Sequence, residues 1–147
     1  MLKSNHGSAI YSQKTSKVHQ QYNRTIDMLG TTTNNILTIC IYIPPNRPWY
    51  TIKDPLKELL EHTNKLAKEN SCKTTIITGD FNHDLHNPSE QITELFKSYN
   101  FIQLITKPTH ILGGILDLIF TNNHSTTASI YPNYFSDHHF IITQIPT

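Results

Sequence analysis

Two short segments rich in Ile and Thr constrain the fold most strongly. The first, ILTICIYI at 36–43, is a nearly continuous apolar run that ends at Pro44–Pro45. The second is TTIITG at 74–79. β-Branched residues favour strands, and a run without polar alternation is typical of a strand that is covered on both faces. The chain is therefore predicted to contain a central sheet with other layers packed against it.

A helix is predicted between these two strands. Asp54 followed by Pro55 is typical of an N-cap and a first helical residue, and the helix then extends to about Asn70. The apolar positions that share one side of this helix are Leu56, Leu59, Leu60, Leu66 and Ala67. This one-sided pattern predicts that the helix covers a sheet.

The remaining elements give the expected fold class. A second helix is predicted to start at Asn87–Pro88, with Ile92, Leu95 and Phe96 on its inner face. Further strands are predicted at 7–13, 116–121 and 140–145, whereas 31–35 is turn-like and 18–29 is ambiguous. Strands outnumber helices, and helices sit between strands. We therefore expect one α/β domain over residues 1–147, an α/β sandwich with a two-layered β core and helices outside.

Composition excludes several classes of protein. The chain has 147 residues, is 37% hydrophobic and carries a net charge of +1, which is unlike a disordered tail or a polycation. No apolar run approaches the roughly 20 residues of a membrane-spanning helix, and the first residues do not resemble a signal peptide. Cys40 and Cys72 are interpreted as reduced thiols. We expect an intracellular protein, nuclear or cytoplasmic and not secreted.

Three strand ends carry polar residues that core packing does not require: GDFNHD at 79–84, LDLIF at 116–120 and SDHHF at 136–140. Metal-assisted phosphoryl transfer explains all three. Asp80 can deprotonate a water, and Asn82 can hold that water or a phosphate oxygen without adding charge.

The same chemistry accounts for the later acids and the histidine. His138 can meet the charge that develops on the phosphate, and Asp117 can fix the tautomer of that histidine. Asp137 supplies a hard oxygen ligand for Mg²⁺.

Each residue also has a simpler reading. Asp and Asn after a strand are most often turn residues. Tyr42 fits core packing as well as a phosphate contact, and Trp49 and Tyr50 fit the edge of the core better than base stacking. His83 and His86 are interpreted as solvent-facing loop residues, because two histidines three apart are thin evidence for zinc.

The order of these segments resembles the endonuclease/exonuclease/phosphatase superfamily, which includes apurinic endonucleases and DNase-type nucleases. The similarity is closest to the endonuclease domains of LINE-type retrotransposons. The motifs that carry it are GSAIYSQ at 7–13, IYIPPN at 41–46, GDFN at 79–82, KPTH at 107–110, LDLIFTN at 116–122 and SDHHF at 136–140. The resemblance covers essentially the whole chain and implies a four-layered, DNase-like α/β sandwich.

The resemblance also implies roles for individual residues near the phosphate. Asp80 matches the acid that activates the water, and Asn82 matches the Asn that contacts the phosphate. Tyr42 matches a Tyr near the scissile phosphate. These residues imply hydrolysis of phosphodiester bonds, with DNA, or alternatively RNA, as the substrate.

Further matches concern the histidine and the metal. His138 matches the catalytic His, and Asp117 matches the acid that orients it. Asp137, together with Asp80, matches the metal site, which implies Mg²⁺ as the cofactor and Mn²⁺ as an alternative. The resemblance implies a nicking DNA endonuclease of retroelement type, a monomer that can belong to a polyprotein with a reverse transcriptase.

One part of the family pattern has no counterpart here. The family begins with a strand ending in an Asn, followed by a Glu that is a principal Mg²⁺ ligand. Only six residues precede Gly7, and the first acidic residue is Asp27. The resemblance therefore implies an N-terminally truncated domain that binds metal weakly. The alternative is a non-catalytic remnant of such a domain, with weak or no nucleic-acid binding.

Overall fold

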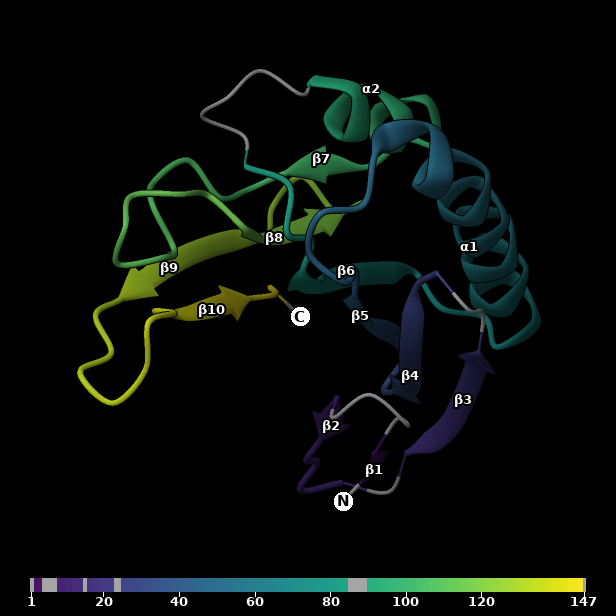
Figure 1. The fold of residues 1–147 in the computed structure, drawn as a ribbon. Helices are drawn as coiled ribbons and strands as arrows, with labels where there is room; N and C mark the ends of the chain where they lie inside the picture. Colours follow the sequence, from purple (N-terminus) through teal and green to yellow (C-terminus); the bar gives the residue numbers. More distant parts are fainter. Residues whose placement is uncertain (1, 4–7, 15, 23–24, 85–89, 147) are drawn as a thin grey trace.

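The computed structural model describes residues 2–3, 8–14, 16–22, 25–84 and 90–146 (Figure 1). The elements in chain order are β1 (Leu2–Lys3), β2 (Ala9–Ile10), β3 (Lys17–Tyr22), β4 (Asp27–Thr33), β5 (Ile36–Tyr42), α1 (Trp49–Glu69), β6 (Thr74–Asp80), α2 (Glu90–Ser98), β7 (Ile102–Gln103), β8 (Asp117–Thr121), β9 (Thr127–Tyr131) and β10 (Phe140–Gln144). None of the described helices is long and apolar enough to cross a membrane.

A mixed six-stranded sheet forms the centre of the molecule, in the order β3-β4-β5-β6-β8-β7. Strands β5 and β6 are parallel, and α1 connects them, whereas every other pair in this sheet is antiparallel. Parallel neighbours require such a crossover, because a short turn cannot return the chain to the same end of the sheet. The strands predicted at 36–43 and 74–79 are confirmed as β5 and β6.

Helices cover one face of this sheet (Figure 1). Leu37, Ile39 and Ile41 of β5 are completely or almost completely buried on that face. Phe96 of α2 stacks on Phe120 of β8, with 3.9 Å between the ring centroids. The residues on the other face of β5 are only half-buried. The sequence predicted that both faces of this strand are covered, but only the face toward the helices is fully buried.

The first helix begins earlier than the sequence predicted. It starts at Trp49, six residues before Pro55, which therefore lies inside the helix, and Pro48 rather than Asp54 is the N-cap residue. The buried stripe of α1 includes Ile52, which is completely buried and extends the apolar face by one turn toward the N-terminus. Burial of this extra turn outweighs the loss of one backbone hydrogen bond at a proline.

Other boundaries also differ from the prediction. The ambiguous stretch 18–29 contributes to two strands, β3 and β4, and β4 continues to Thr33, so only Asn34 and Asn35 form the turn. Both asparagines have positive φ, which Asn tolerates better than most residues. The strand predicted at 7–13 is confined to β2, and the predicted helix start at 87–88 lies outside the described residues.

Strands β9 and β10 form a separate two-stranded antiparallel sheet. The sequence predicted β10, but not β9 and not this pairing. Ala128, Ile130 and Ile141 of this hairpin pack against the hydrophobic core. A hollow of about 310 Å³ is lined by residues of β2, β4 and β5 and by Ile145, so the small sheets lie over the second face of the main sheet. The predicted α/β sandwich is confirmed.

Candidate active site

Three polar side chains lie in one row across the main sheet, at one end of its strands β5, β6 and β8. Tyr42 of β5 is the register partner of Asp80 in β6, and Asp80 is the partner of Asp117 in β8. Residues directly opposite each other on neighbouring strands point to the same face. The row lies on the face opposite the helices, because Ile41 and Gly79 next to it belong to the helical face.

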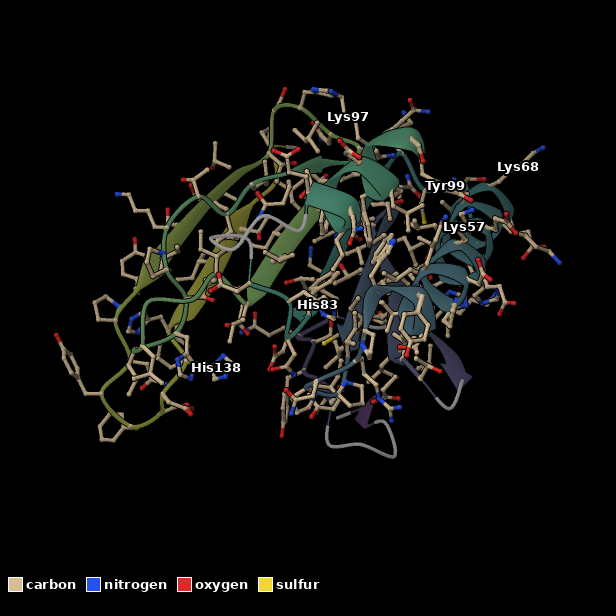
Figure 2. The ribbon with its side chains drawn as sticks, turned by 45° about the horizontal axis from the view of Figure 1, so that its top comes forward. Lys57, Lys68, His83, Lys97, Tyr99 and His138 are labelled. Atoms are coloured by element: carbon tan, nitrogen blue, oxygen red, sulfur yellow. The ribbon has the colours of Figure 1, made fainter. Side chains whose placement is uncertain are left out.

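His138 completes this group from outside the main sheet. Its Nδ1 atom lies 2.7 Å from Oδ2 of Asp117, and its Nε2 atom lies 3.9 Å from Oδ2 of Asp80. Figure 2 shows His138 on the side of the molecule away from Lys57 and Lys68 of α1. The structure therefore brings together Asp80, Asp117 and His138, as the sequence predicted.

Backbone contacts hold His138 in this place. The segment 109–110 runs beside 138–139, where His110 and His138 form an isolated β-bridge and the backbone N–H of His139 donates to the carbonyl of Thr109 at 2.7 Å. Ser136 Oγ accepts the backbone N–H of His138 at 3.2 Å. The hydrogen bond to Asp117 therefore rests on a fixed backbone.

Thr109 was not predicted as a site residue, yet it positions Asp117. It is fully buried, and its Oγ1 accepts the backbone N–H groups of Leu116 and Asp117 at 3.1 and 3.0 Å. The signal in the sequence was the KPTH motif at 107–110, to which no role was assigned. A buried hydroxyl that satisfies two backbone donors fixes the start of β8.

Asn82 lies in a tight turn that follows β6. Its φ is 49°, its backbone N–H donates to Oδ1 of Asp80 at 2.9 Å, and its Nδ2 donates to the carbonyl of Ile43 at 2.7 Å. One amide hydrogen and the amide oxygen of Asn82 are left for other partners. The backbone of Asn82 therefore lies against the Asp80 carboxylate, and the bond to Ile43 fixes the orientation of its side-chain amide.

Asp137, predicted as a metal ligand, lies against His110. Oδ2 of Asp137 is 3.4 Å from Nε2 of His110, and Nδ1 of His110 accepts the backbone N–H of Leu112 at 3.1 Å. That bond leaves the proton of a neutral His110 on Nε2, where it faces Asp137. The rings of His110 and His138 meet edge to face, with centroids 5.0 Å apart.

The surroundings of the site raise the pKa of both Asp80 and His138. Burial raises the pKa of Asp80, the Asn82 backbone N–H lowers it, and the charge of Asp117 raises it, so that the pKa lies above its usual value. Burial lowers the pKa of His138. The opposing effects are larger: the hydrogen bond and charge of Asp117, and the charges of Asp80 and Asp137, raise this pKa to above its usual value.

The pKa of Asp137 shifts in the opposite direction. Desolvation raises it, but hydrogen bonds from its own backbone N–H and from His110, and the charges of His138 and His110, lower it more. The net pKa of this exposed carboxyl lies below its usual value, so Asp137 is ionised at neutral pH.

Two groups of side chains could hold a metal ion. Within each group, one ligand atom per residue lies within 4.8 Å of the others: Asp80, Asp117 and His138 form the first, and His110, Asp137 and His138 the second. Neither group contains both Asp80 and Asp137, the pair that the sequence predicted as metal ligands. The carboxylates of the first group are hard donors that fit a divalent cation such as Mg²⁺.

The remaining candidates have different surroundings. Tyr42 is half-buried in the row with Asp80. Trp49 packs against the core at the start of α1, while Tyr50 is exposed. Nδ1 of His83 lies 3.0 Å from the carbonyl oxygen of Phe81, and His86 lies outside the described residues. Asp27, the β4 partner of Tyr42, is buried, and its Oδ2 has no hydrogen-bond partner among the described residues.

The solved structures that match this chain include two toxins. The chain matches the cytolethal distending toxin of Haemophilus ducreyi with a TM-score of 0.62 and 18% identity, over 90% of this chain and 59% of that one. The match to the toxin of Actinobacillus actinomycetemcomitans has a TM-score of 0.61 and 16% identity, over 86% of this chain and 56% of that one.

A retrotransposon domain matches as well. The endonuclease domain of TRAS1, a telomere-specific non-LTR retrotransposon, has a TM-score of 0.59 and 16% identity, over 87% of this chain and 66% of that one. The chain thus spans 56 to 66% of the length of these three structures. A comparison with curated proteins found no match.

The sequence itself also matches a family. Residues 36–142, which are 107 of the 147 residues, match the family described as endonuclease-reverse transcriptase. This range includes Tyr42, the GDFN and KPTH motifs, Asp117 and His138. The chain belongs to the endonuclease-reverse transcriptase family, within the endonuclease/exonuclease/phosphatase superfamily, and has its DNase-like fold.

Proposed function

We propose that this chain hydrolyses phosphodiester bonds with the help of a divalent cation, as a DNA endonuclease of retroelement type that nicks its substrate. The observation that carries the proposal is the contact of His138 with two carboxylates, at 2.7 Å from Asp117 and 3.9 Å from Asp80. Family membership supports a nuclease, and the site suits attack on a negatively charged ester.

His138 is the group that meets the phosphate. With Asp117 bound at Nδ1, its Nε2 side is left to face the substrate, and the raised pKa of His138 favours the imidazolium form. A positive N–H donor there stabilises the charge that grows on the phosphate oxygens as the bond to water forms. Asp117 fixes the orientation of the His138 ring and compensates the positive charge of that ring.

Asp80 is the group that takes the proton of the attacking water. Its raised pKa makes it a stronger base than an exposed Asp. The backbone N–H of Asn82 binds Oδ1, so the proton goes to Oδ2, which lies 3.9 Å from Nε2 of His138. Asn82 contacts the phosphate or the water with its remaining amide atoms, and Tyr42 lies beside the scissile phosphate.

Asp80 and Asp137, one from each of the two groups that share His138, would hold the cation together with the amide oxygen of Asn82. Mg²⁺ is the main candidate and Mn²⁺ an alternative. When bound, a divalent cation supplies charge stabilisation to the phosphate. Asp137 is ionised at neutral pH, which suits a ligand role. The proposal includes DNA as the substrate, an intracellular location, and a monomer that can belong to a polyprotein with a reverse transcriptase.

Nicking of supercoiled plasmid tests the proposal. The protein is incubated with millimolar Mg²⁺ or Mn²⁺, or with EDTA, because few carboxylates make a weak metal site. We expect metal-dependent conversion to open circles, and loss of at least about 100-fold in rate for His138→Ala and for Asp80→Asn, the magnitude typical of a general acid or base.

His124→Ala serves as the matched control. His124 is exposed and lines a hollow with Asn34 and Lys73, at the opposite end of the sheet from Asp80. This variant should nick at the parental rate. Nicking that persists in His138→Ala after repurification would refute the assignment. No metal-dependent nicking by the parent under any of these conditions would favour the non-catalytic alternative.

A further inference from the structure

Two adjacent aromatic side chains next to the candidate active site are almost completely exposed. Tyr134 is 90% exposed and Phe135 is 99% exposed. Both lie in the connection between β9 and β10, which also carries Asp137 and His138 (Figure 1). Aromatic side chains gain most from burial, so the stability of this chain does not explain why two of them face solvent.

The connection that carries these aromatics is held by its own hydrogen bonds. Oδ1 of Asn133 accepts the backbone N–H of Phe135 at 3.0 Å, and the backbone N–H of Asn133 donates to Nδ1 of His139 at 3.4 Å. His139 in turn donates its backbone N–H to the carbonyl of Thr109 at 2.7 Å. The aromatic pair is therefore presented on a structured turn, which lowers the entropic cost of binding a ligand there.

The aromatic pair is close enough to His138 to contact the same substrate molecule. Two residues lie between Phe135 and His138, and the three peptide steps that join them span at most about 10 to 11 Å. Successive nucleotides in one strand of a duplex lie about 3.4 Å apart along the helix axis. The two or three nucleotides that flank a phosphate bound at His138 are thus within reach of the aromatic pair.

We propose that Tyr134 and Phe135 form a stacking surface for unpaired or unstacked bases that flank the phosphodiester bound at His138. This inference rests on the proposed function and specifies its substrate. Neither side chain carries a charge at neutral pH, so neither can contribute by attracting phosphates. Aromatic faces stack on every base, and the contact is therefore tolerant of sequence. The predicted substrate is DNA with single-stranded or melted nucleotides beside the cleaved bond.

The test compares two ligands that differ only in their bases. One is oligothymidylate, and the other is an oligonucleotide of equal length built from abasic sites, which has the same phosphates and no bases. Binding is measured by fluorescence anisotropy in EDTA, so that no cleavage occurs. In the double variant Tyr134→Ser/Phe135→Ser, we expect Kd for oligothymidylate to rise about tenfold, as for one lost stacking contact. Kd for the abasic strand should stay unchanged.

Tyr11→Ser is the matched control variant. Tyr11 is 76% exposed, but it lines a hollow with Asn34 and Ile36, at the end of β5 opposite Tyr42. This variant should bind both ligands as the parent does.

A second variant, Phe135→Trp, keeps an aromatic ring and reports directly on stacking. Its added fluorescence should be quenched by oligothymidylate and not by the abasic strand. This measurement stands even where the double serine variant does not fold.

Four results would overturn the inference. They are an equal loss of affinity for both ligands, no loss for either, no binding of either ligand by the parent, and a change confined to self-association in sedimentation velocity. The last result would assign the aromatic pair to contact with a second copy of the chain. Loss of nicking with base-dependent binding intact would refute the proposed function instead, so the two failures are distinguishable.

Discussion

Replacing Gly79 with alanine should displace the candidate active site and destabilise the protein. Gly79 directly precedes Asp80 and has a φ of 147°, a conformation that L-residues rarely adopt. A Cβ atom built there would lie 1.8 Å from the carbonyl oxygen and 2.8 Å from the carbonyl carbon of Ile41 on the neighbouring strand. Because the overlap is with backbone and not with a flexible side chain, β5 and β6 must move apart.

The size of the effect follows from these distances. Relieving the overlap to 3.0 Å requires a shift of 3.0 − 1.8 = 1.2 Å. Such a shift breaks the bond of 3.0 Å from Ile43 N–H to the Asp80 carbonyl and the bond of 2.7 Å from Asn82 to the Ile43 carbonyl. Two lost hydrogen bonds cost about 2 kcal/mol, in addition to about 1–3 kcal/mol of backbone strain.

Gly113→Ala is the control, because Gly113 has a φ of 93° but no atom within 4 Å of the built Cβ. It should show backbone strain alone. At about 2–4 °C per kcal/mol for a chain of this size, the midpoint of thermal unfolding by circular dichroism should be about 4–8 °C lower for Gly79→Ala than for Gly113→Ala. Equal midpoints for the two variants would refute the close-approach argument.

Three further predictions concern the histidines. Asp117→Asn should lower the pKa of His138 in an NMR titration and reduce nicking by at least about 100-fold; an unchanged titration would show that Asp117 does not act through the ring. Because the folded-state pKa of His138 is raised, its pairing with Asp117 stabilises the fold below the ordinary His pKa, and this contribution is lost as the pH rises through the raised value. The difference in unfolding midpoint between the parent and His138→Gln should therefore shrink with rising pH, and a constant difference would contradict the pairing. His110→Gln keeps an N–H group that can reach Asp137, so it should nick faster than His110→Phe; equal rates in the plasmid assay would mean that the contact has no part in the reaction.

The sequence predicted the central strands and most of the site because their signals are local. The Ile- and Thr-rich runs at 36–43 and 74–79 are strands by residue preference alone, and Asp80 directly follows the second run. The start of α1 was misjudged because Asp54–Pro55 is a local capping signal, whereas the helix is extended by burial of Ile52 in tertiary contacts. Strand β9 was missed because TASIY is short and half exposed, and its only signal is pairing with β10.

The site residues that escaped prediction depend on contacts distant in sequence. Thr109 matters only because β8 begins beside it, and His110 only because the segment carrying Asp137 returns to it. The sequence showed both residues within one motif but contained no sign of their partners. The pairing of Asp80 with Asp137 at one metal ion stays a prediction, because these two carboxylates belong to different groups around His138.

The candidate site joins two separate sheets, and this affects how activity would respond to fluctuations. Asp80 and Asp117 belong to the six-stranded sheet, whereas His138 lies two residues before β10, which among the described strands pairs with β9 alone. A two-stranded hairpin has little stability of its own, and such units open locally at a lower free energy than the whole fold. Transient opening of this hairpin would separate His138 from both carboxylates while the main core stayed folded, so inactivation on mild heating should precede global unfolding.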